Sequence, residues 1–192
     1  DKRIFLCWGK PYLPFLSDKF SLLSLFPINE SFIFEDSWQT QITINVGEET
    51  EVSESITVEN KVIIEEEIQQ SLETELSFST SAINNLKSKL NTAINKKYIS
   101  ETRCEINKTN TKKYTLPPIP EDVNQKYIVR KVVESAPVYI EFRVLLERKC
   151  SVCSNSQLIP FTLYKQTNKI ATRNTDYFND HSIEKIFVGI HT

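Results

Sequence analysis

An alternation of apolar and polar residues with a period of two constrains the fold of this chain more than any other feature. Between Gln39 and Val58 the large apolar residues fall at even positions, and polar residues fill the odd ones. This pattern is typical of a strand with one buried face, because successive side chains leave a strand in opposite directions. Gly47 lies where the chain is expected to bend. The pattern therefore predicts a half-buried strand or hairpin over residues 39–58.

The alternation continues to Phe78, but a helical period fits the same region. Apolar residues from Ile68 onward, with Ile83 at an odd position among them, also share one helical face at 100° per residue, and this face extends to Tyr98. Residues 65–76 are rich in Glu and Gln, which favour helices and are depleted in strands. This chemistry favours a helix over residues 59–76, followed by a second helix over 82–99 or continued as one long helix. The apolar stripe consists of Ile68, Leu72, Leu76, Ile83, Leu86, Leu90 and Ile94.

Charge is polarised along this helical region. Acidic residues dominate from Glu48 to Glu75, and lysines dominate from Lys87 to Lys113. An antiparallel helical hairpin would set the acidic arm against the basic arm, and staggered copies of a long helix would do so between chains. Either arrangement gives the apolar stripe a second helix or a second subunit to cover it.

Residues 1–37 are dense in aromatic residues and proline. Proline at this frequency is incompatible with one long helix or with a central strand. We expect an irregular N-terminal arm with one short helix near Ser17–Phe26, because Ser17 and Asp18 can cap its first turn.

The clearest strand lies at Val138–Leu146, where even-numbered apolar residues alternate with Tyr, Glu and Arg. Further strands are expected at Tyr127–Val133, Leu158–Lys165 and Lys185–Ile190. The sequence thus predicts an α+β fold with a sandwich-like antiparallel β-sheet core. Residues 38–192 form one domain in this prediction, and a long amphipathic helix or helical hairpin is inserted around 59–99.

Recognisable catalytic machinery is missing from the sequence. His181 and His191 are its two histidines, and neither has a convincing nucleophile or orienting acid nearby. The three glycines, Gly9, Gly47 and Gly189, form no glycine-rich phosphate loop. We expect no enzymatic activity, no catalytic residue and no cofactor.

The four cysteines include one pair, Cys150 and Cys153, at a spacing that suits two ligands of a tetrahedral zinc ion. A complete site needs two more ligands, and only isolated Cys7, Cys104, His181 and His191 are on offer. This shortage favours a structural disulfide or buried thiols over a metal site.

The net charge of −2 argues against nucleic acid as a partner, because such proteins usually carry a clear basic excess. No apolar run approaches the roughly 20 residues of a membrane-spanning helix. The even number of cysteines, the two N-glycosylation sequons at Asn29 and Asn107, and the lack of Met, which a removed signal peptide would explain, favour a secreted protein. Four thiols are also ordinary in a cytoplasmic chain.

Two functions fit these observations. The first is a non-enzymatic structural or assembly protein that binds another copy, or a protein partner, through the apolar stripe and the sheet faces. The alternative is a secreted pore-forming protein that inserts a β-hairpin into membranes, since the alternation from Ile42 to Phe78 suits strands with one face in lipid and one in water. A membrane is a partner only under the alternative.

Overall fold

The computed structural model describes residues 19–57, 61–75, 78–98, 107–149 and 155–192. They belong to two compact units. The described residues of the first unit lie within Asp1–Glu30, Lys61–Thr102 and Ile140–Lys165, and those of the second within Ser31–Asn60, Arg103–Tyr139 and Gln166–Thr192. The elements in chain order are β1 (Lys19–Phe32), the 3-10 turn η1 (Glu35–Ser37), β2 (Gln39–Asn45), β3 (Glu49–Thr57), β4 (Val62–Ile64), α1 (Glu66–Thr74), α2 (Thr80–Tyr98), β5 (Asn107–Thr115), β6 (Ile128–Lys149), β7 (Ser156–Phe178) and β8 (Ile183–His191).

The fold is largely antiparallel β-sheet, with 59% strand against 21% helix. The predicted α+β fold with a long helix is therefore wrong. Two causes account for the difference. The strands predicted around Pro137 are one strand, β6, and β7 is longer than its apolar run suggests. The helical region is divided into two short helices, and the β-branched residues Val62 and Ile64 form strand β4 instead of a helical turn.

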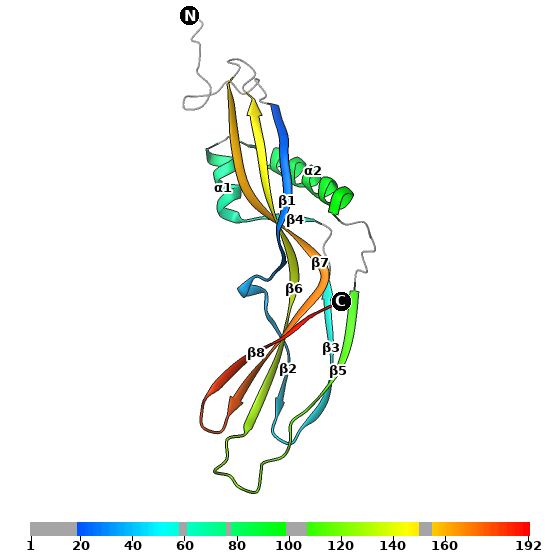
Figure 1. The fold of residues 1–192 in the computed structure, drawn as a ribbon, viewed down its shortest axis with the longest axis vertical. Helices are drawn as coiled ribbons and strands as arrows, with labels where there is room; N and C mark the ends of the chain where they lie inside the picture. Colours follow the sequence, from blue (N-terminus) through cyan, green and yellow to red (C-terminus); the bar gives the residue numbers. More distant parts are fainter. Residues whose placement is uncertain (1–18, 58–60, 76–77, 99–106, 150–154) are drawn as a thin grey trace, which may run out of the picture. The chain divides into compact units, whose positions relative to one another are not determined.

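The first unit consists of a sheet with two helices packed on it. Its strands follow the order β1, β6, β7, β4, with β6 contributing residues from Ile140 onward and β7 residues up to Lys165. Figure 1 shows α1 and α2 beside the upper parts of these strands. Phe142, Val144 and Leu146 of β6 and Leu163 of β7 are buried with Leu90 of α2 and other helical residues in one core cluster. Burial of each such side chain is worth roughly 1.5 to 3 kcal/mol before entropy is subtracted.

The second unit pairs β2 with β6 and β8 with β7, and it also holds the separate strand pair β3–β5. Ile44, Leu116 and Val133 form its small apolar cluster. Two ion pairs also stabilise the second unit: Lys131 Nζ lies 2.9 Å from Asp176 Oδ1, and Arg173 Nε lies 2.8 Å from Glu134 Oε2. The hydrogen bonds from Arg173 lower the pKa of the Glu134 carboxyl below its ordinary value of 4.5.

Several predicted elements need correction. The short helix expected at 17–26 is wrong, because Lys19–Phe32 is strand β1, which tolerates Pro27 at a sheet edge. The bend at Gly47 is confirmed, with φ at +79°, but β2 and β3 do not form a hairpin with each other. The strand at Val138–Leu146 is confirmed as part of β6. Of the five even-numbered residues expected on its inner face, Val138, Phe142, Val144 and Leu146 are buried and Ile140 is partly buried, while Tyr139 of the expected outer face is buried as well.

The predicted strands at 158–165 and 185–190 are also confirmed, as parts of β7 and β8. The boundary proposed at residue 37 and the single domain 38–192 stay predictions.

Candidate functional site

Strands β3 and β5 form an antiparallel pair, although 49 residues, 58–106, separate them in the chain. The pairing runs from Glu49 opposite Thr115 to Thr57 opposite Asn107. The intervening residues include β4, α1 and α2. We call residues 65–98, which contain α1 and α2, the helical segment. Chain connectivity places this segment between the two strands of the pair, and most of its described residues form helices in this structure.

The apolar stripe of the helical segment is covered by the chain's own sheet. Leu72, Ile83, Leu90 and Ile94 are at most 2% exposed and lie in the core cluster of the first unit, with Ile68 and Leu86 partly buried against it. Leu76 lies outside the described residues. The predicted use of this stripe in binding a partner stays a prediction, since in this fold its contacts are intramolecular.

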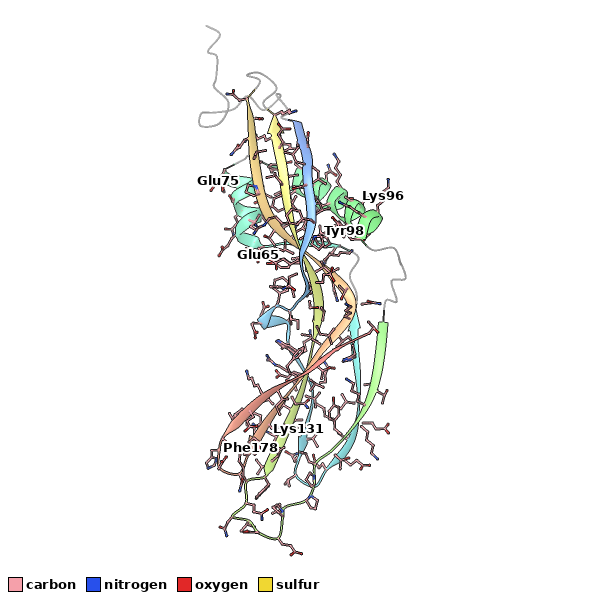
Figure 2. The ribbon with its side chains drawn as sticks, viewed as in Figure 1. Glu65, Glu75, Lys96, Tyr98, Lys131 and Phe178 are labelled. Atoms are coloured by element: carbon pink, nitrogen blue, oxygen red, sulfur yellow. The ribbon has the colours of Figure 1, made fainter. Side chains whose placement is uncertain are left out.

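Polar contacts fasten both ends of the helical segment to strands. The Tyr164 hydroxyl donates a hydrogen bond of 2.8 Å to Glu65 Oε1, immediately before α1. At the end of α2 the Tyr98 hydroxyl donates a bond of 2.7 Å to the carbonyl oxygen of Leu25. Figure 2 labels Glu65 and Tyr98 at these two places. The segment is thus held in its helical form by the sheet as well as by its core.

The adjacent residue of β7 provides a third fastening. Lys165 is only 3% exposed, and its Nζ donates a hydrogen bond of 2.8 Å to Asn91 Oδ1 in α2. Burial, followed by the hydrogen bond to Glu65, raises the pKa of the neighbouring Tyr164 hydroxyl far above its ordinary value of 10.0. Tyr164 consequently remains a hydrogen-bond donor throughout the physiological pH range.

Charges in the middle of the helical segment follow a period of two, which a helix does not require, whereas the charges at its two ends, residues 65–67 and 96–97, are consecutive. Between Ile68 and Ile94 every charged residue has an odd number, namely Glu73, Glu75, Lys87 and Lys89. Even-numbered positions that are exposed on the helices carry neutral side chains throughout this stretch. They are Gln70, Thr74, Thr80, Asn84, Ser88 and Thr92.

The buried stripe alone does not explain this charge pattern. Residues spaced by four, such as Leu86, Leu90 and Ile94, keep one parity automatically while they follow a helical face. Exposed positions such as Ser88 and Thr92 are free of that constraint, and Lys or Glu would be better helix formers there. Their neutrality is what one face of a strand in lipid would need.

The structure does not test the predicted cysteine sites. Cys7, Cys104, Cys150 and Cys153 all lie outside the described residues, so the disulfide, thiol and zinc alternatives stay open. Across the described ranges, no group of three or more His, Cys, Asp or Glu could hold a metal ion. Among those residues, no helix has both the length and the apolar character needed to cross a bilayer.

A shallow pocket in the second unit contains His181 together with Asn45, Arg130, Tyr177 and Phe178. Cations near its aromatic residues stack on their rings: Arg130 Cζ lies 4.0 Å from the centre of the Tyr177 ring, and Lys126 Nζ lies 4.0 Å from that of Phe178. Figure 2 labels Phe178. His181 is an exposed turn residue with φ at 67°, whose backbone N–H donates to the carbonyl of Phe178. These contacts within the protein account for how the side chains of the pocket are arranged.

Sequence reasoning located the apolar stripe but missed the strands and anchors around it. The pairing of β3 with β5 and the contacts of Tyr164 and Lys165 join residues far apart in the chain. The acidic and basic arms were the available sign that the two sides of the segment face each other. Comparison with known proteins adds no assignment, since no family model matches the chain and no curated protein sequence is detectably similar to it.

Proposed function

We propose that this chain is a non-enzymatic membrane-acting protein that forms pores by inserting its helical segment as a β-hairpin. The observation that carries the proposal is the neutrality of the exposed even positions between Ile68 and Ile94. This stretch excludes the charged even positions Glu66, at the start of α1, and Lys96, near the end of α2. A soluble helix gains nothing from this arrangement, whereas a charge on the lipid-facing side of a membrane strand costs roughly 2 to 4 kcal/mol near the bilayer midplane.

Two features of the fold support the proposal. Strands β3 and β5 already pair in the antiparallel sense that a hairpin requires, so the helical segment would only extend an existing pair. Helix α1 has 9 residues, below the roughly 12 to 15 at which an isolated helix becomes marginal, and α2, with 19 residues, gains most of its stability from packing on the sheet. Their release from the sheet would therefore leave them free to adopt another structure.

A single hairpin cannot cross a bilayer by itself, because its outer strand edges would leave backbone groups unpaired in hydrocarbon. The proposal therefore includes self-association into a closed barrel, which agrees with the homo-oligomer expected from the sequence. Strand β8 offers a surface for a second copy: Ile183, Ile186, Phe187 and Val188 are all at least 45% exposed on it. Such an exposed apolar edge strand is prone to pair with another chain.

Leakage of a dye from liposomes tests the proposal, with two substitutions on α2 as a matched pair. Thr92 and Asn85 are both exposed on the helix, but Thr92 is even and Asn85 is odd. Thr92→Lys puts a charge on the lipid face at a cost of roughly 2 to 4 kcal/mol near the bilayer midplane and should abolish leakage. Asn85→Lys adds the same charge between the two arms, outside the proposed lipid face, and should leave leakage close to that of the unmodified chain.

Both variants should melt at the unmodified temperature, because each replaces an exposed residue. Equal leakage by the two variants would contradict the strand phase. Failure of the unmodified chain to release dye, over a range of lipid compositions, would contradict the function itself.

A further inference from the structure

The two arms of the helical segment match each other at most facing positions when they are written as antiparallel strands, the exceptions being Glu67 opposite Asn95 and Gln69 opposite Ala93. Pairing starts with Glu65 opposite Lys97, and each step forward on the first arm is a step back on the second, ending with Glu75 opposite Lys87. In this alignment four Glu residues each face a Lys. These pairs are Glu65–Lys97, Glu66–Lys96, Glu73–Lys89 and Glu75–Lys87.

The uncharged residues match in the same alignment. Ile68 faces Ile94 and Leu72 faces Leu90, so apolar residues meet their own kind. Neutral polar residues also meet, with Gln70 opposite Thr92 and Thr74 opposite Ser88. Opposite charges and paired apolar side chains each stabilise facing strand positions by roughly 0.2 to 1 kcal/mol.

The helical structure packs the apolar residues Ile68, Leu72, Leu90 and Ile94 in one core cluster but, among the side chains that the structure describes, makes no use of the charge matches. Glu75 and Lys89 are exposed, as are Glu66 and Lys96, and Lys87 donates its hydrogen bond of 2.8 Å to Gln69 instead of to a carboxylate. Glu75 and Lys96 are labelled in Figure 2, on α1's end and on α2. A pattern that one fold leaves unused calls for another conformation in which it is used.

We infer that residues 65–75 and 87–97 have a second folded form, a β-hairpin with this pairing whose even face is a binding surface for the hydrocarbon core of a bilayer. This inference rests on the proposed function. Each arm has the roughly 9 to 11 residues that a tilted strand needs to cross a membrane. The even face is neutral from Ile68 to Ile94, and its two charges, Glu66 and Lys96, face each other at one end of the arms.

The matched pairing differs by two residues from a direct continuation of β3–β5. Continued without a shift, Thr57 opposite Asn107 leads to Glu75 opposite Lys89 and to Ile68 opposite Lys96, a mismatch. A shift of two preserves the face of every side chain, whereas a shift of one would exchange the faces. The resting strands already contain such an offset contact, since Glu49 forms an ion pair with Lys113 as well as facing Thr115.

Charge exchange in the full chain tests the pairing by the rate of liposome leakage. Glu73→Lys and Lys89→Glu each place like charges face to face, and each should slow leakage about tenfold. The double variant Glu73→Lys with Lys89→Glu restores an opposite pair and should recover at least most of the unmodified rate.

The second double variant, Glu75→Lys with Lys89→Glu, separates the two alignments. In the matched alignment it creates two repulsive pairs, so it should leak more slowly than either single variant. Rescue by this double variant in place of the first would establish the direct continuation and overturn the inference. Rescue by neither would overturn cross-strand pairing, while leakage by the unmodified chain would leave the proposed function standing. If the unmodified chain releases no dye, both the proposed function and this inference are contradicted.

Discussion

Strand β6 and the helical segment carry the same alternation but fold differently. β6 places Phe142, Val144 and Leu146 in the core as alternate residues of a strand. In α1 and α2 the even-numbered apolar residues reach the same core from a helical face. The difference lies in the other residues: around its core positions β6 has Val, Ile, Tyr and Leu as well as Glu and Arg, whereas the helices have mainly Glu, Gln, Lys, Asn and Ser.

This comparison teaches that an apolar period does not by itself select one structure. In β6 both the period and the local propensity favour a strand, so the element has one folded form. In the helical segment the local propensity and the packing favour helices, while the charge pattern and the facing residues favour strands. Such a conflict between levels is expected where a segment changes conformation in its function.

The largest expected effect tests the strand side of the comparison. Phe142 is fully buried and its ring centre lies 5.3 Å from that of Tyr98 on α2. Phe142→Ala should therefore cost roughly 3 to 5 kcal/mol, measured by chemical denaturation. Arg143 is exposed on the opposite face, and Arg143→Ala should cost well under 1 kcal/mol. Equal costs would mean that both faces of this part of β6 are covered.

A smaller effect tests how the helical segment is held. Tyr164→Phe removes the hydrogen bond to Glu65 and should lower stability by about 1.5 kcal/mol, because the acceptor is a carboxylate. Leakage should become faster, since the start of α1 is released more easily. Glu65→Gln retains an acceptor and serves as the control with a smaller change. Slower leakage by Tyr164→Phe would contradict a holding role for this contact.

A still smaller effect separates helix from strand preference at one exposed site. Thr92→Ala favours the helix by about 0.5 kcal/mol and disfavours the strand. The melting temperature should rise slightly while leakage slows. Asn85→Ala gives a similar gain in helix preference outside the paired arms and should slow leakage less. A rise in both melting temperature and leakage rate for Thr92→Ala would contradict conversion of the helical segment into strands.

The least effect concerns acid stability of the second unit. The pKa of Glu134 is lowered chiefly by the hydrogen bonds from Arg173. Its contribution is therefore fully present above the unfolded pKa, near 4.5, and is lost as the pH falls through the lower folded value. Denaturation midpoints measured between pH 6 and pH 3 should fall less steeply for Glu134→Gln than for the unmodified chain. Parallel curves would mean that this pair contributes nothing to the acid transition.

Much of the sheet could be predicted from the sequence, and the reasons for the failures are local. The strands within β6, β7 and β8 were visible because their apolar residues are consecutive or alternate. Strand β1 was missed since its aromatic residues and Pro27 resemble an irregular arm, and only pairing with β6 makes it a strand. The three residues of β4 were too few to interrupt a helical pattern.

The candidate site was predictable only in part. The stripe with Leu72, Leu90 and Ile94 follows from spacing alone. The sequence pattern could not identify the anchors Tyr164 and Lys165. Their hydrogen-bond partners, Glu65 and Asn91, lie 99 and 74 positions earlier in the chain. The Glu and Lys residues are visible in the sequence as two charged arms, but the strand pairing proposed for them builds on the antiparallel pairing of β3 with β5, which the sequence does not show.

Site-by-site polarity in the membrane-bound state tests the conversion most directly. A polarity-sensitive fluorescent residue introduced singly at each position from Lys87 to Ala93 would report whether that side chain lies in lipid or water. Conversion predicts a blue shift on adding liposomes at positions 88 and 92, which are exposed in the soluble fold, an emission that stays blue at the buried position 90, and no blue shift at 87, 89, 91 and 93. A shift that recurs every three to four residues, or spectra that remain those of the soluble chain while leakage proceeds, would contradict it.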